Sequence, residues 1–155
     1  MSRTRIDEPD SNGERPLDQS TLLRLVGYNA RRAYLNVLSL FMERMAKYEL
    51  RTVDYTVITL VNMNPGITQK RLSRALSISP PNLATLLDKL EARGLLERQR
   101  NPADKRSQVL VLTPEGQKLC KKADKAVFEL ENKATSALTD EERVQLIQLL
   151  QKIYL

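Results

Sequence analysis

The sequence predicts a mainly α-helical protein that carries one small β-hairpin. Over most of the chain, apolar residues recur at steps of three and four, which is the period of an amphipathic helix. Two strand-like runs, 95–100 and 107–113, flank a basic turn at 101–106. Immediately upstream, two short helical patterns are joined by a tight turn. Together these observations predict a winged helix-turn-helix with further helices on either side.

The chain begins with a polar arm and a long helix. Residues 1–19 are rich in Pro, Gly, Asp and Glu, and we expect a flexible arm there. A helical pattern follows over 20–47, with apolar positions at Leu22, Val26, Ala30, Ala33, Val37 and Phe41. Leu23, Tyr34, Leu38 and Met45 widen this stripe beyond what one partner requires, so we expect one side to pack within the domain and the other against a second chain.

Three shorter helices are predicted next. Each follows a residue whose side chain can cap a helix, and each stops at a turn: 53–63 after Thr52, 69–76 after Thr68, and 80–93 after Ser79. Pro80 suits the first position of its helix, where a missing N–H costs little. Gly94 ends that helix and leads into the hairpin.

Two helices close the chain. Thr113-Pro114-Glu115 starts a helix that we expect to run to about residue 137. Thr139 and Glu142 have the spacing of a capping box, which opens a last helix over 141–154. Its apolar stripe consists of Val144, Ile147, Leu150 and Ile153.

The charge is unevenly distributed along the chain. The 155 residues include 25 Lys and Arg against 19 Asp and Glu, a formal net charge of +6. Residues 65–106 hold the largest excess and cover the helix-turn-helix and hairpin. This is where a nucleic-acid surface needs positive charge, although a solvated basic face would give the same count.

Several functional classes are excluded by what the sequence lacks. It has no histidine and one cysteine, Cys120, so one chain can form neither a disulfide framework nor a Cys/His metal site. It has no glycine-rich phosphate loop and no nucleophile–base pair, so we expect no enzyme and no cofactor. It also lacks an apolar run near membrane-spanning length and a signal-peptide core, so we expect a cytoplasmic protein. Cys120 is either a packed thiol or, next to Lys121 and Lys122, an activated one.

The second helix of the predicted pair suits the major groove of DNA. Asn82 can pair with adenine, Pro81 can contact a thymine methyl group, and Ser79 and Thr85 can bond phosphate or base, with Lys89 two turns further on. At the start of the preceding helix, Thr68 and Gln69 would place N–H groups against phosphate. Taken singly, each of these is also an ordinary surface residue. As an ordered set they predict binding to double-stranded DNA.

The hairpin adds a second set of basic groups. Arg106 suits the narrow minor groove, while Lys105 and Arg100 can neutralise phosphates. Asp104 is the exception, because a carboxylate facing DNA is repelled. We therefore expect Asp104 to brace the wing by holding Arg106 or Arg98 through a charge-assisted bond.

Four motifs follow one another between residues 66 and 116: Gln69…Leu72-Ser73, Leu87-Asp88-Lys89-Leu90-Glu91-Ala92-Arg93-Gly94-Leu95-Leu96, Asp104-Lys105-Arg106 and Leu112-Thr113-Pro114-Glu115-Gly116. In these motifs the sequence resembles the MarR family of winged helix-turn-helix regulators. The resemblance implies one domain over 20–155, with the winged helix-turn-helix at 52–113 and a helical dimerisation lobe at 20–48 and 114–155. It also implies a homodimeric repressor on a pseudo-palindromic operator. The chain departs from the family at Ala84 and Thr85, where many members carry an Arg or Lys.

The resemblance further implies a small-molecule effector. Members of this family often sense aromatic acids, and a cluster on the first helix would suit one: Tyr28, Arg31, Arg32 and Asn36. Because adjacent arginines point about 100° apart on a helix, only one of the two would enter a given pocket. The pattern is similar to members that control aromatic-acid catabolism, so an aromatic carboxylate or its CoA thioester is the expected effector. Alternatively, the arginines pair with acids such as Glu131 or Glu142. Two other functions remain open: redox sensing through Cys120, and architectural DNA binding without a ligand.

Overall fold

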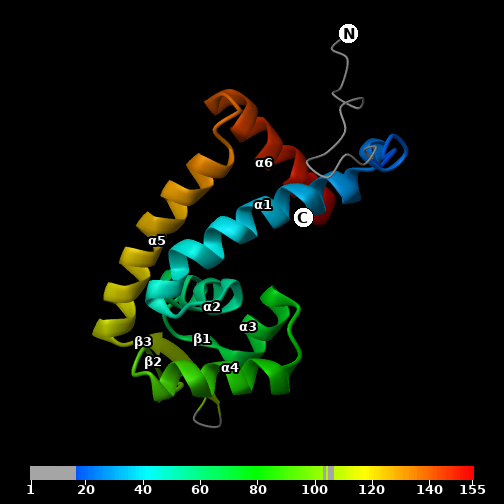
Figure 1. The fold of residues 1–155 in the computed structure, drawn as a ribbon. Helices are drawn as coiled ribbons and strands as arrows, with labels where there is room; N and C mark the ends of the chain where they lie inside the picture. The colour runs from blue at the N-terminus through cyan, green and yellow to red at the C-terminus, as the bar shows by residue number, and fades with distance from the viewer. Residues whose placement is uncertain (1–16, 103, 105–106) are drawn as a thin grey trace. The chain divides into compact units, whose positions relative to one another are not determined.

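A computed structural model describes residues 17–102, 104 and 107–155 (Figure 1). The chain divides into two compact parts after Asn36, within the first long helix. The structure confirms the predicted fold class, mainly helical with a small antiparallel sheet. The elements in chain order are η1 Leu22–Arg24, α1 Val26–Met45, η2 Ala46–Tyr48, α2 Thr52–Met63, β1 Ile67–Thr68, α3 Gln69–Leu76, α4 Pro80–Ala92, β2 Leu96–Arg100, β3 Gln108–Leu112, α5 Pro114–Ala134 and α6 Asp140–Tyr154.

The long helix predicted over 20–47 is interrupted. A single turn of 3₁₀-helix, η1, ends at Leu25, whose backbone is extended (φ −97°, ψ 125°), and α1 begins after it. The side-chain amide of Asn29 donates to the carbonyl oxygens of Leu23 and Leu25, at 2.9 and 2.8 Å. The Leu25 carbonyl oxygen also accepts the backbone N–H of Asn29 at 3.1 Å, so this one residue joins η1 to the first turn of α1. Most of the predicted arm, 1–16, lies outside the described residues.

The cap predicted for α2 is wrong. Thr52 is already the first helical residue, and Arg51 occupies the capping position. The carboxylate of Asp54 accepts the backbone N–H of Arg51 at 2.9 Å and two further bonds from its guanidinium, each 3.0 Å long. An acidic group in the first turn thus satisfies an exposed N–H and complements the helix dipole.

The sheet has three strands in the order β1-β3-β2, all antiparallel. The hairpin of β2 and β3 was predicted to within a residue at each end, and Arg98 of β2 lies opposite Leu110 of β3. Strand β1 was not predicted. It is two residues long, and it pairs with β3 next to a bond from the Gly66 N–H to the Leu110 carbonyl oxygen of 3.0 Å.

Helices α3 and α4 form the predicted helix-turn-helix. Thr68 caps α3, because its hydroxyl accepts the N–H of Arg71. The turn passes through Ser77, whose backbone lies in the left-handed region (φ 52°). It is closed by Ile78, whose backbone N–H donates to the Ser73 carbonyl oxygen and whose carbonyl oxygen accepts the Ser73 hydroxyl. The fully buried residues that hold the two helices over α2 and the sheet are Val57, Ile58, Val61, Leu72, Leu83, Leu87, Leu90, Leu96 and Leu110.

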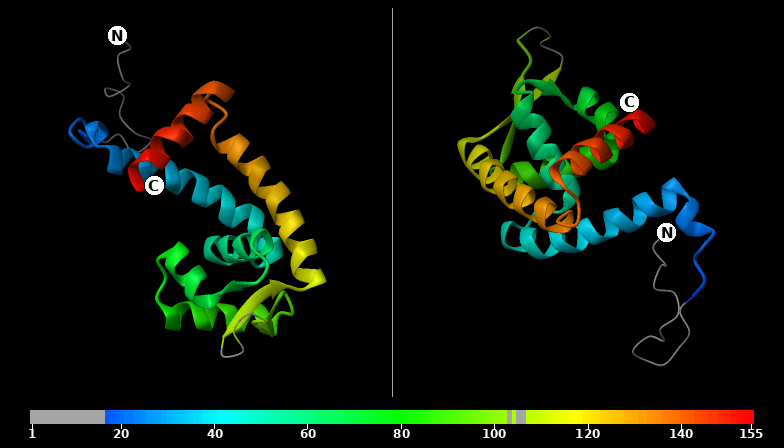
Figure 2. Two further views of the ribbon diagram at one scale, coloured as in Figure 1. Left: turned by 180° about the vertical axis from the view of Figure 1, so that it is seen from behind. Right: turned by 90° about the horizontal axis from the view of Figure 1, so that it is seen from above.

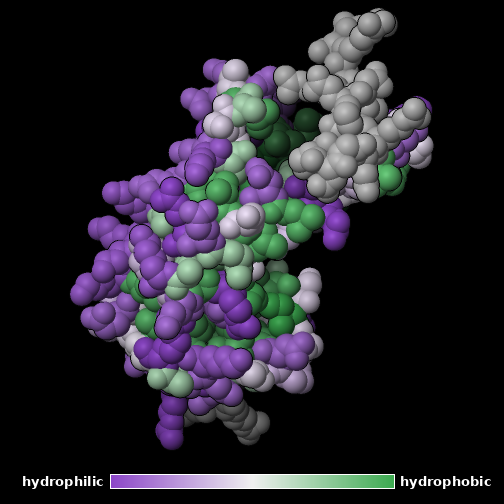
Figure 3. All heavy atoms as spheres, viewed as in Figure 1, coloured by the Kyte–Doolittle hydropathy of each residue, from purple (hydrophilic) through white to green (hydrophobic). Residues whose placement is uncertain are grey.

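Helix α5 leads away from the sheet, and α6 follows it after a short turn (Figure 2). Helix α5 ends at Ala134, earlier than expected, where the Thr135 hydroxyl donates to the Glu131 carbonyl oxygen at 2.7 Å. The capping box of Thr139 and Glu142 is confirmed. Hydrophilic side chains cover the outer edge of α5 (Figure 3).

The apolar stripe of α6 is uncovered within one chain. Its predicted members are all exposed, by 37% at Leu150 to 67% at Ile153. Exposed apolar side chains gathered along one helix mark a surface that another molecule covers. Among the described residues, no helix combines the length and the apolarity required to cross a membrane.

Candidate nucleic-acid interface

The first turns of α4 present polar side chains on the face of the helix opposite its buried side. Ser79, Pro81, Asn82 and Thr85 are all exposed. The opposite face is anchored in the core by Leu83, Leu86, Leu87 and Leu90. Ser79 takes the N-cap position without a capping bond from its side chain, and Thr85 bonds only back to the Pro81 carbonyl oxygen. The chain therefore displays an exposed row of mostly polar side chains on a helix whose other face is fixed in the core.

The start of α3 lies beside this row. The Gln69 side-chain amide donates to the Pro80 carbonyl oxygen at 3.4 Å, which ties the beginnings of the two helices together. Gln69 and Pro80 also line an open hollow with Lys70, Ser73 and Arg74. Because the Thr68 hydroxyl is used as a cap, backbone N–H groups rather than this side chain remain for an anion at the helix start.

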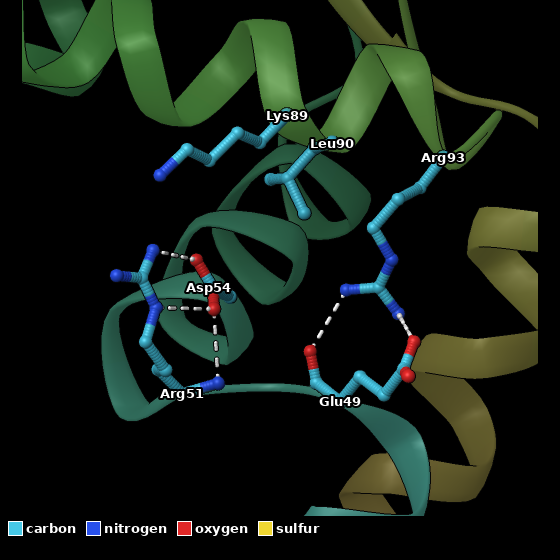
Figure 4. A pocket seen from close by; sticks show the side chains of 6 residues that line it. All are labelled: Glu49, Arg51, Asp54, Lys89, Leu90 and Arg93. Atoms are coloured by element: carbon cyan, nitrogen blue, oxygen red, sulfur yellow. Dashed lines mark hydrogen bonds and ion pairs between the residues drawn. The ribbon is translucent and has the colours of Figure 1, made fainter.

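Lys89 lies on the flank of α4 that faces α2. Its ammonium group and the Arg51 guanidinium reach toward the same hollow (Figure 4). At the other end of that hollow, Arg93 donates to the carbonyl oxygens of Tyr48 and Glu49, at 2.9 and 2.8 Å. These last bonds fix the end of α4 against the segment before α2.

Asp54 keeps the Arg51 guanidinium in place at the same hollow. Burial alone would raise the pKa of the Asp54 carboxyl, but hydrogen bonds from Arg51 and the charges of Arg51 and Arg93 hold that pKa below its ordinary value. The carboxylate is therefore ionised at neutral pH, and Arg51 is oriented although most of its side chain is exposed.

Arg98 connects the wing to α4. Its guanidinium pairs with Glu91, and it donates to Asp88 at 2.6 Å, while its backbone N–H also donates to Glu91. Its side chain is only 17% exposed. Asp104 was one expected partner of Arg98, and the structure pairs the Arg98 guanidinium with these two carboxylates of α4. The spacing of Asp88 and Glu91, three residues apart on one helix, is the signal that could have indicated this arrangement.

The wing turn is closed by its own hydrogen bonds. The Asn101 side chain donates to the Ser107 hydroxyl at 2.9 Å, and the backbone N–H of Asp104 donates to the Asn101 carbonyl oxygen. Arg100 ends β2 with an exposed side chain. Lys105 and Arg106 lie outside the described residues, so the brace between Asp104 and Arg106 stays a prediction.

The base of the wing is joined to α5. The Thr113 hydroxyl donates to the Gly94 carbonyl oxygen at 2.6 Å and accepts the N–H of Gly116. Gly116 also lies against the backbone of Leu95. Three residues of the predicted motifs, Gly94, Thr113 and Gly116, therefore meet at one junction.

The expected effector residues lie on the first turns of α1. Tyr28 is half-buried and its hydroxyl bonds Gln19, whereas Arg31, Arg32 and Asn36 are exposed. Since α1 is a regular helix from Val26, Arg32 and Asn36 lie within about 80° of Tyr28 on one side, and Arg31 lies about 60° away on the other. The register therefore groups Arg32, rather than Arg31, with Tyr28 and Asn36.

Cys120 lies in the core between α2 and α5. Its side chain is fully buried, and burial together with the negative charge of Asp124 raises its pKa to about 11. Asp124 also accepts the Tyr55 hydroxyl at 2.9 Å. A buried thiol that keeps its proton is a poor nucleophile, so these surroundings argue against the activated thiol that redox sensing requires.

Comparisons with known proteins find transcriptional regulators, one of them solved on a DNA duplex. The model of the MarR family matches residues 49–107. The transcriptional regulator HosA of Escherichia coli O111:H- is 30% identical over 127 residues, covering 79% of this chain and 94% of the relative. The transcriptional repressor CouR bound to a 23-mer DNA duplex superposes with a TM-score of 0.83 at 36% identity, covering 88% of this chain and 97% of that one. CouR bound to p-coumaroyl-CoA gives a TM-score of 0.78 at 33% identity, covering 88% and 96%.

Proposed function

The chain belongs to the MarR family of DNA-binding transcriptional regulators, and from that premise we propose that it is a homodimeric repressor released from its operator by an aromatic acid or the CoA thioester of one. The observation that carries the proposal is the exposed row on α4. It offers hydrogen-bonding groups on a helix whose other face is fixed in the core.

On DNA, α4 occupies the major groove and its first turns read bases. Asn82 pairs with adenine and Pro81 contacts a thymine methyl group, while Ser79 and Thr85 bond base or phosphate. Phosphates are held by the start of α3 at Thr68 and Gln69, and by the basic side chains Lys89, Arg100 and Lys105. Arg106 enters the minor groove beside the wing.

Two copies are needed to read a pseudo-palindrome. The exposed apolar side chains of α6 support dimerisation, because a second copy would remove them from water. In such a dimer the two α4 helices reach successive major grooves when they are about 34 Å apart. This supports the proposed division of 20–155 into a winged helix-turn-helix at 52–113 and dimerisation helices around it.

The effector would act by shifting the dimer between two spacings of its recognition helices. An arginine fork suits a carboxylate or phosphate, and Tyr28 and Asn36 suit a ring hydroxyl. A ligand that binds the misspaced dimer more tightly lowers the population that fits the operator. The likeness to CouR bound to p-coumaroyl-CoA supports an aromatic thioester as the class of ligand.

Two measurements test the proposal. Selection of duplexes from a random library with the full-length protein should yield a pseudo-palindrome bound far more tightly than mixed-sequence DNA. A thermal-shift screen of aromatic acids and their CoA esters should identify ligands that also release that duplex. Equal affinity for all duplexes and no stabilising ligand would instead support an architectural DNA-binding protein.

A further inference from the structure

We propose that Arg98 is a positioning residue of the DNA-binding surface, which pairs with two carboxylates of α4 and holds the wing strand against that helix without contacting DNA itself. The inference rests on the proposed function, because it concerns how α4 and the wing approach a duplex. It assigns Arg98 a different role from Arg100, its neighbour on the same side of β2.

The geometry of Arg98 is that of a clamp. One terminal nitrogen pairs with Glu91 and the other donates to Asp88, so both ends of the guanidinium fork are occupied. The backbone N–H of the same residue donates to Glu91 at 3.3 Å. The two acids come from α4 and the arginine from β2, so these bonds join the recognition helix directly to the wing.

The electrostatic reason for this clamp lies in the position of the acids. Asp88 and Glu91 lie one turn beyond the exposed row on the first turns of α4, and the Asp88 side chain is 66% exposed. A helix in the major groove has phosphates on both sides, and unpaired carboxylates on it would repel them. Pairing both acids with one guanidinium halves their combined charge and so lowers that repulsion.

Arg98 differs from an arginine that grips phosphate. Its side chain is mostly covered, and its donors already have carboxylate partners. Arg100, two residues further along the strand, has an exposed side chain. Removing either arginine lowers the charge of the protein by the same amount, so the pair Arg98→Gln and Arg100→Gln is a matched comparison.

The experiment is a double-mutant cycle on the full-length dimer. The acid pair is neutralised by Asp88→Asn with Glu91→Gln in three backgrounds: wild type, Arg98→Gln and Arg100→Gln. Affinity for the duplex selected with the wild type, and for a mixed-sequence duplex, is measured across a salt series. Arg98→Lys is added as a variant that keeps the charge but not the two-ended fork.

We expect Arg98→Gln to weaken binding by about tenfold without changing the slope of log affinity against log salt, since no phosphate contact is lost. Arg100→Gln should lower that slope by about one. Neutralising the acids should restore binding in the Arg98→Gln background by about tenfold more than in the other two. Arg98→Lys should fall between wild type and Arg98→Gln.

Equal gains from acid neutralisation in all three backgrounds would overturn the inference, because they would reflect overall charge alone. A lower salt slope for Arg98→Gln would also overturn it and would make Arg98 a phosphate contact. These failures differ from failure of the proposed function, in which the wild type itself prefers no duplex. Circular dichroism and unfolding of each variant verify that the measured losses come from folded protein.

Discussion

The backbone carbonyl of Leu95 lies so close to Gly116 that a Cβ atom added there would stand 1.9 Å from its oxygen. The contact closes the junction between the base of the wing and the first turn of α5. Only a glycine leaves room for it, and the obstacle is backbone, which cannot rotate away as a side chain can.

Gly116→Ala should therefore destabilise the protein by about 1–3 kcal/mol through forced backbone displacement. Gly27→Ala is the control, since a Cβ there meets nothing within 4 Å and alanine favours the helix. Urea unfolding measures both. Equal stability of the two variants would show that the α5 junction can shift at little cost.

Cys120 should make stability fall at alkaline pH. Its pKa is raised from 9.0 to about 11 in the folded protein, so between these values the unfolded thiol loses its proton while the buried thiol keeps it. This contribution to the free energy of unfolding is fully present below pH 9, and about 3 kcal/mol of it is lost as the pH rises through 11. Cys120→Ala should remove this part of the decline in urea unfolding series. A matching decline in the variant would contradict it.

The same burial should protect Cys120 from oxidation. Treatment of the native protein with peroxide at neutral pH should leave its affinity for the operator unchanged, and thiol reagents should react only as fast as the protein opens. Rapid modification of Cys120 in the native protein, with release of DNA, would instead support redox sensing.

Asn82→Ala should relax base preference more than it weakens binding to mixed-sequence DNA. The side chain is exposed on α4 and its expected partner is one adenine, which is worth about 1–3 kcal/mol of discrimination. Competition binding with duplexes changed at single positions measures the effect. A uniform loss across all sequences would place Asn82 on phosphate instead.

Arg106→Ala should weaken operator binding by roughly 1–3 kcal/mol if its side chain enters the minor groove. Titrations at moderate salt, with the fold verified by circular dichroism, measure the change. Unchanged affinity would remove the wing from the interface.

Arg32→Ala should blunt the response to an aromatic ligand more than Arg31→Ala, because Arg32 shares its side of α1 with Tyr28 and Asn36. Both variants should bind the operator as the wild type does. Ligand titrations of the DNA complex separate the two arginines. A full response in both variants would move the ligand away from this part of α1.

The features that depend on local chemistry could be predicted from the sequence. The helix-turn-helix follows from the spacing of Leu83 and Leu87 and from the cap at Thr68, and the capping box at Thr139 follows from its own spacing. The hairpin follows from two runs of suitable length around one turn. In each case the residues that form the element are close together in the sequence.

Features that depend on tertiary packing, or on which of several local hydrogen bonds forms, could not be predicted in this way. Strand β1 is too short to show a period, and it exists because β3 lies beside it. The choice of Asp54 rather than Thr52 at the start of α2 depends on where Arg51 folds back. The pairing of Arg98 with Asp88 and Glu91 depends on which side of α4 the wing strand lies, and the sequence does not indicate that side. The interruption at Leu25 depends on two bonds from one amide, that of Asn29.

The clamp of Arg98 on two carboxylates has an evolutionary consequence. A descendant that loses the arginine while keeping both acids carries a repulsive recognition helix, and one that loses the acids keeps a cation with no role. Substitutions at 88, 91 and 98 should therefore be inherited together across related lineages, whereas substitutions at Arg100 should occur independently of these three.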